Sequence, residues 1–181
     1  PGGDLLPSGA AGVAGVQPGL AARPVPREPA AQGVLRDAGL RVGHQALIYP
    51  VTDMTEGLQQ DPSYLGNERG IVLSNDDMDV FHGHYVHEDT DMTDFRLSPL
   101  LAADLTDLPP AVVVVAGLDP LHDSGVRYAQ ALADAGNQVR VEDFHQMPHG
   151  FLSFPYFCQG ARPAVDAIVA RKVSARSSLV T

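Results

Sequence analysis

The sequence has few cysteines, few basic residues and no long apolar segment, and each shortage narrows the range of functions. A single cysteine, Cys158, cannot form an internal disulfide and is typical of a reducing compartment, so we expect a cytoplasmic protein. Twelve basic residues against 22 acidic ones leave a net charge of −10, which disfavours binding to nucleic acid or anionic lipid. The longest apolar run, residues 111–118, is too short to cross a bilayer, and no secretory leader is visible. We therefore expect neither a nucleic-acid partner nor stable membrane insertion.

The composition divides the 181 residues into two parts. Residues 1–43 are dominated by Ala, Gly, Pro and Arg and carry a net charge of +1, whereas residues 44–181 carry −11. The repeated prolines of the first part interrupt helices and inner strands, and such segments bury little surface. We expect residues 1–43 to be a low-complexity segment that is disordered or not native to the protein. Residues 44–181 are long enough to form one domain with a hydrophobic core.

Residues 111–151 predict a βαβ unit. Four consecutive valines within residues 111–116 are typical of a strand buried on both faces. Turn residues follow, and Asp123 and Ser124 are candidates to cap a helix. Gly136 ends that helix, and the apolar residues Val139, Val141 and Phe144 indicate a second strand over residues 138–144. Asp119 follows the first of these strands and His149 the second, so we expect both at the carboxyl edge of a parallel sheet, where ligands gather.

Three further elements follow from hydrophobic patterning. Residues 45–49 read as a short buried strand that ends at Pro50. Residues 78–86 and 161–174 place their apolar side chains at helical spacing. The predicted fold class is therefore α/β, with parallel strands flanked by helices.

The motif Asp119-Pro120-Leu121-His122-Asp123, followed by His149-Gly150-Phe151, resembles the C-terminal part of α/β-hydrolase esterases and lipases of the hormone-sensitive-lipase type. Motifs at residues 47–53, 97–100 and 108–110 occur in the order found in that family, and the likeness covers roughly residues 45–168. The resemblance implies the C-terminal part of an α/β-hydrolase fold and hydrolysis of a small-molecule carboxylic ester by a Ser-His-Asp mechanism, without metal or organic cofactor. It implies that Asp119 orients the imidazole of His149, which transfers the proton. It predicts no oligomeric state.

The nucleophile of such a mechanism is not identifiable in this sequence. No Gly-x-Ser-x-Gly motif occurs. Ser8 has the small Ala10 two positions after it but Leu6 two positions before it, and no apolar strand precedes it. Residues 19–23, where family spacing places the serine, contain none. The His-Gly-Gly-Gly type of oxyanion loop is absent too. A truncated esterase gene or an out-of-frame reading of residues 1–43 would explain this. We expect the chain alone to be inactive, and an inactive hydrolase remnant or a non-enzymatic binding domain remains the alternative.

Other constellations carry weaker signals. His82, His84 and His87 resemble a metal-binding pattern, but no ligand set of defined spacing completes a zinc site, so we expect a solvated helix end. Acidic residues at 76, 77 and 79 lack the spacing of a calcium loop and fit a helix start better. The aromatic residues of segment 151–157 are candidates for an acyl pocket or, more simply, for the core, and Cys158 is expected to pack there.

Overall fold

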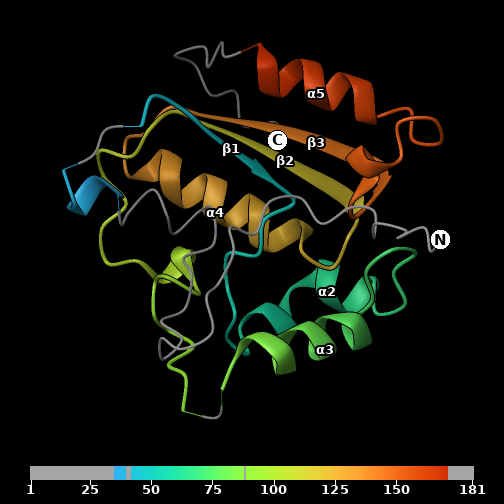
Figure 1. Ribbon diagram of the computed structural model, residues 1–181, viewed down its shortest axis with the longest axis horizontal. Coiled ribbons are helices and arrows are strands. Elements are labelled where there is room, and N and C mark those ends of the chain that lie inside the picture. The colour runs from blue at the N-terminus through green and yellow to red at the C-terminus, as the bar shows by residue number, and fades with distance from the viewer. Residues whose placement is uncertain (1–34, 40–41, 88, 171–181) are drawn as a thin grey trace, which may run out of the picture.

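The computed structural model describes residues 35–39, 42–87 and 89–170, and these contain one parallel sheet of three strands (Figure 1). The strand order is β1 (Gln45–Ile48), β2 (Ala111–Leu118), β3 (Val139–Pro148). In register, Gln45 of β1 and Val139 of β3 both align with Ala111 of β2. The predicted α/β class with parallel strands is confirmed. Within the described residues, no strand pairs with the outer edge of β1.

The central strand β2 is buried on both faces, as its valines predict. Val113 and Val115 pack toward α4 (His122–Asp134), and Val112 and Val114 pack toward α5 (Ala161–Val169). Alternate residues of a strand point to opposite faces, so one run of apolar residues supplies two cores. Figure 1 shows α4 and α5 on opposite faces of the sheet.

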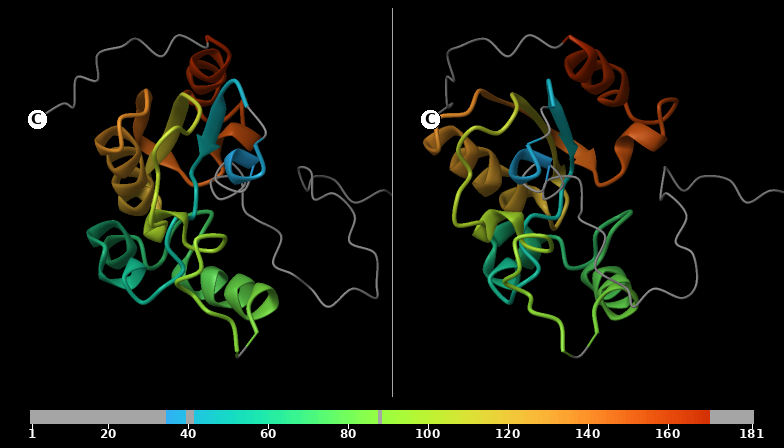
Figure 2. Two further views of the ribbon diagram at one scale, coloured as in Figure 1. Left: turned by 90° about the vertical axis from the view of Figure 1, so that its left-hand side faces the viewer. Right: turned by 60° about the vertical axis from the view of Figure 1, so that its left-hand side comes forward.

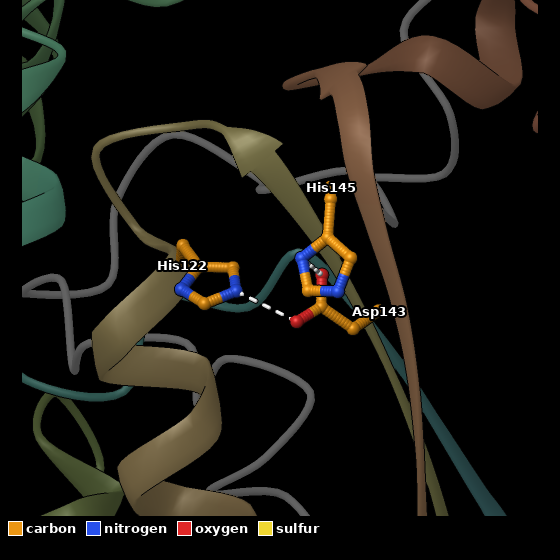
Figure 3. Close-up of side chains that lie close together, drawn as sticks. All are labelled: His122, Asp143 and His145. Atoms are coloured by element: carbon orange, nitrogen blue, oxygen red, sulfur yellow. Dashed lines mark hydrogen bonds and ion pairs between the residues drawn. The ribbon is translucent and has the colours of Figure 1, made fainter. Parts of the chain in front are cut away.

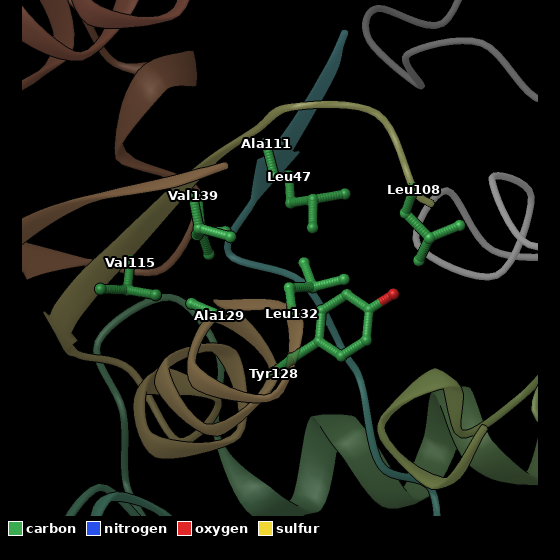
Figure 4. Packing of buried hydrophobic residues seen from close by; sticks show 9 residues of the cluster. Leu47, Leu108, Ala111, Val115, Tyr128, Ala129, Leu132 and Val139 are labelled. Atoms are coloured by element: carbon green, nitrogen blue, oxygen red, sulfur yellow. The ribbon is translucent and has the colours of Figure 1, made fainter. Parts of the chain in front are cut away.

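The core between the sheet and α4 is formed by side chains from all three strands and the helix (Figure 4). Tyr128, Ala129 and Leu132 of α4 are buried against Leu47, Val113 and the neighbouring apolar residues of the sheet. The helical spacing of these residues places them on the one face that α4 turns to the sheet. This packing fixes the first turn of α4 close to the carboxyl ends of the strands.

The start of α4 differs from the prediction. Its N-cap residue is Leu121, which makes no side-chain cap hydrogen bond. Asp123 instead accepts a hydrogen bond from the Ser63 backbone N–H at 2.9 Å, and the buried Ser124 hydroxyl lies 2.6 Å from that of Thr52. The side chains of Asp123 and Ser124, which the local sequence predicts as helix caps, therefore bond residues that are distant in the sequence.

The segment between β1 and β2 contains two helices, α2 (Pro62–Gly66) and α3 (Asn75–Tyr85). In both views of Figure 2 they lie on the side of the sheet away from α5. Helix α3 begins three residues before the predicted start, because Ser74 and Asp77 form a capping box ahead of the apolar stripe. The acidic residues there belong to a helix start, as expected. The single-turn helices are η1 (Leu58–Gln60), η2 (Pro99–Leu101) and η3 (Phe151–Ser153).

The predictions for the two ends of the chain fall largely outside the described residues. Residues 1–34, 40–41 and 171–174 are among those not described, so the disorder expected for residues 1–43 and the end of the predicted last helix stay predictions. In the described turn around residue 36, the Arg36 guanidinium donates to the Thr106 carbonyl at 2.8 Å. Among the described helices, none is both long and apolar enough to traverse a bilayer.

Candidate active site

Asp119 lies immediately after β2, with its side chain only 1% exposed. Its Oδ1 accepts a hydrogen bond from the Leu121 backbone N–H at 2.9 Å, which closes a turn at the end of the strand. This bond is the ordinary turn-forming role of an aspartate before a proline. It uses only one carboxylate oxygen, and Oδ2 stays free for a second partner.

That second partner is His149, the residue that follows β3. Its Nδ1 lies 2.7 Å from Asp119 Oδ2, and its side chain is 24% exposed. Gly150, directly after it, has a φ of +71°, a left-handed conformation that glycine adopts without strain. This turn ends β3 and leads the chain into η3. The structure therefore brings together the two residues that sequence spacing nominates.

Tyr49, the residue after β1, packs against this pair and was not nominated from the sequence. Its ring centroid lies 4.8 Å from that of His149 and 5.7 Å from that of Phe151. Burial and, more weakly, the nearby Asp119 carboxylate raise the pKa of the Tyr49 phenol, against the opposing effect of a hydrogen bond with the Leu152 backbone. The neutral phenol ring thus forms one wall beside the imidazole. Tyr49 follows a strand end as Asp119 and His149 do, and that position is the signal that identifies it.

A pocket of about 850 Å³ opens beside His149. Such a volume suits a small-molecule ligand. Its walls come mainly from the segment between β1 and β2 and from the turn after Asp119. The apolar side chains of the lining are Val51, Met54, Leu58, Tyr64, Leu73, Met78, Phe81, Met92 and Leu121.

The aromatic segment after β3 does not line this pocket. Phe151 is buried in the core beneath α5, and Cys158 packs against the same cluster, as expected. Phe154, Tyr156 and Phe157 are exposed. The simpler interpretation, that this aromatic cluster belongs to the core, is confirmed for Phe151 and wrong for the three exposed residues, and an acyl pocket built from the segment is not observed.

The remaining candidates lie elsewhere. His84 and His87 are exposed on and just after α3, and His82 lines the pocket, but the three do not form a metal-ligand cluster among the described residues. No serine of the described residues is hydrogen-bonded to His149. Four of their hydroxyls bond other groups, namely those of Ser63, Ser74, Ser98 and Ser124.

Comparison with known proteins gives a consistent result. A family model described as alpha/beta hydrolase fold matches residues 29–153. The chain is 40% identical over 126 residues to the carboxylic ester hydrolase LipN of Mycobacterium tuberculosis, which covers 69% of this chain and 33% of LipN. It is 42% identical over 77 residues to the hormone-sensitive lipase of Mus musculus, covering 41% of this chain and 10% of the lipase.

Solved structures share the fold. The ester hydrolase EH1AB1 from the metagenome of Lake Arreo superimposes with a TM-score of 0.73 at 42% identity, covering 78% of this chain and 44% of that one. A hyperthermophilic esterase from Pyrobaculum calidifontis gives a TM-score of 0.71 at 32% identity, covering 78% of this chain and 47% of that one. The chain therefore spans less than half the length of these relatives.

Proposed function

Since the chain belongs to the α/β-hydrolase family of esterases and lipases of the hormone-sensitive-lipase type, we propose that it supplies the acid and the base of a carboxylic ester hydrolase. The observation that carries this proposal is the hydrogen bond of 2.7 Å between His149 Nδ1 and the buried Asp119. A carboxylate at Nδ1 holds the imidazole proton there and leaves the Nε2 lone pair available as a base.

In the proposed reaction, His149 Nε2 removes the proton of a serine hydroxyl as that oxygen attacks the ester carbonyl. The imidazolium then donates the proton to the departing alcohol, which leaves an acyl-serine. Water, activated by the same nitrogen, releases the acid. The Asp119 carboxylate keeps its charge throughout and stabilises the imidazolium beside it. The scheme needs no metal or organic cofactor, and this sequence identifies neither its serine nor its oxyanion loop.

The pocket beside His149 suggests the substrate class. Its walls are mostly apolar, which suits the acyl part of an uncharged ester. One relative is named an ethyl acetate hydrolase, from Pseudomonas putida, and is 35% identical over 108 residues. We therefore propose esters with short to medium acyl chains as substrates.

A chimera tests the proposal. Residues 45–170 of this chain replace the corresponding segment of LipN, which supplies the rest of the hydrolase. Hydrolysis of p-nitrophenyl butyrate and labelling by a fluorophosphonate probe are then measured. We expect turnover, and we expect Asp119→Asn and His149→Gln each to lower kcat by about a thousandfold or more. The unfused chain is expected to be silent in both assays.

Two exposed residues provide matched controls. His84→Gln and Asp134→Asn make the same chemical changes outside the site and should leave turnover intact. If the chimera is folded by circular dichroism but neither hydrolyses the ester nor reacts with the probe, the proposal is wrong. The segment is then better described as a binding domain or an inactive remnant.

A further inference from the structure

A second group of histidine and carboxylate side chains lies where α4 begins beside β3 (Figure 3). It consists of His122, the first residue of α4, with Asp143 and His145 of β3. Their ligand atoms all lie within 4.8 Å of one another. Asp143 and His145 are two residues apart and share the strand face of Val139, which α4 covers. The start of the helix and the middle of the strand thus present these side chains to a common point.

His122 is already oriented as a metal ligand would be. Its Nδ1 lies 2.8 Å from Asp123 Oδ1, and a backbone N–H of Ser63 holds the other oxygen of Asp123 at 2.9 Å. A carboxylate at Nδ1 fixes the proton on that nitrogen and turns the Nε2 lone pair outward, as in many zinc sites. That Nε2 lies 3.1 Å from Asp143 Oδ2, which accepts its proton when no metal is present, and a bound cation would take the place of that proton.

The spacing of the three ligand atoms suits a small divalent cation. Bonds of about 2.0–2.1 Å in tetrahedral geometry place neighbouring ligand atoms about 3.3 Å apart. His122 Nε2 lies 3.1 Å from Asp143 Oδ2, whereas His145 Nδ1 lies 3.2 Å from the other oxygen of that carboxylate, Oδ1. The remaining separation closes by rotation of His145, whose side chain is 80% exposed. His122 and Asp143, whose side chains are 20% and 26% exposed, are therefore already in contact, and the more exposed His145 is the ligand that must rotate.

We propose that His122, Asp143 and His145 bind Zn²⁺, with water in the fourth position. Two imidazole nitrogens and one carboxylate oxygen are a donor set that zinc accepts. With neutral imidazoles, the carboxylates of Asp123 and Asp143 give the site a negative charge that favours a dication. The ion would tie the start of α4 to β3, three residues after Asp119 and four residues before His149. Zinc would then brace the two segments that carry the proposed acid and base, although its binding does not depend on the proposed ester hydrolysis.

Calorimetric titration of the full 181-residue chain with Zn²⁺ tests the site, with Co²⁺ absorption as a second signal. His145→Asn is the first variant, because an exposed side chain is replaced without disturbing the core. We expect it to weaken zinc binding about tenfold or more and to remove the tetrahedral Co²⁺ bands. His145→Cys, which restores a good zinc ligand, should retain tight binding and shift the Co²⁺ spectrum toward that of a thiolate complex.

The double variant His84→Asn/His87→Asn is the matched control, since it removes two exposed histidines from the other histidine-rich segment. It should bind zinc as the original chain does. At one zinc concentration, zinc should also raise the melting temperature of the original chain and of the control by more than that of His145→Asn. The absence of saturable zinc binding, or equal binding by His145→Asn and the original chain, overturns the proposal. Loss of binding in the control overturns it as well.

Discussion

The hydrogen bond between Asp119 and His149 should contribute more to folding than a surface ion pair does, and a double-mutant cycle measures that contribution. The cycle compares the original chain with Asp119→Asn, His149→Gln and the double variant. Equilibrium urea unfolding gives the free energy of unfolding of each. Far-ultraviolet circular dichroism is a suitable signal, because the chain has no tryptophan. The coupling energy is the difference between the summed losses of free energy of unfolding in the two single variants and the loss in the double variant.

The geometry sets the expected size of this coupling. The 2.7 Å distance is short, and the Asp119 side chain is 1% exposed, so the bond forms largely away from water. A hydrogen bond to a charged group contributes about 1.5–3 kcal/mol. His149 is 24% exposed and keeps part of its hydration, which favours the lower half of that range. We expect a coupling energy of about 1.5–2 kcal/mol.

A second histidine–aspartate pair in the same chain serves as the control. His145 lies 3.2 Å from Asp143, but its side chain is 80% exposed, so the same cycle there should give less than about 0.5 kcal/mol. Both cycles are measured with a chelator present, so that metal binding does not contribute. If the coupling between Asp119 and His149 is no larger than that of the control pair, the bond does not hold the imidazole. The proposed orientation of the base then loses its physical support.

Three further predictions concern the fold that carries the site. Leu132→Ala should lower the free energy of unfolding by about 2–5 kcal/mol in urea, because the fully buried side chain leaves a cavity between α4 and the sheet. Gly117→Ala should cost about 1–3 kcal/mol in the same assay, since its new methyl carbon would stand 2.2 Å from the carbonyl oxygen of His145. Burial raises the pKa of Tyr128 to about 12, so the folded state resists ionisation of this phenol. The contribution of this raised pKa to the free energy of unfolding is fully present below the ordinary tyrosine pKa of about 10 and is lost as pH rises toward 12. Tyr128→Phe should therefore lose less stability at alkaline pH, as measured by urea unfolding at a series of pH values.

Motifs in the sequence were sufficient to nominate the proposed acid and base. Asp119 and His149 each follow a run of strand-forming residues, and parallel strands joined by one helix end at the same edge. Local patterning thus predicted that the two side chains would be neighbours. Residue order does not reveal that Asp119 uses one oxygen for its own turn and the other for His149. Their catalytic roles stay predictions, to be decided by the chimera.

Side-chain contacts between residues distant in the sequence could not be predicted from local patterns. Asp123 and Ser124 have the composition of a helix cap, yet Ser63 and Thr52, about sixty and seventy residues earlier, take those side chains as partners. Within the described residues, the histidines that lie close together in the sequence around position 84 do not form a metal-ligand cluster. A different set, built from the start of α4 and the middle of β3, does.

Taken alone, the sequence determined the parallel α/β architecture, the family resemblance and the order of aspartate and histidine along the chain, because hydrophobic period and turn chemistry act over a few residues. The tertiary structure decided which atoms meet: Asp119 Oδ2 with His149 Nδ1, Tyr49 with the imidazole, and His122 with Asp143. These contacts join residues between 21 and 100 positions apart. Their geometry depends on strand register and on the packing of α4, which no local pattern specifies.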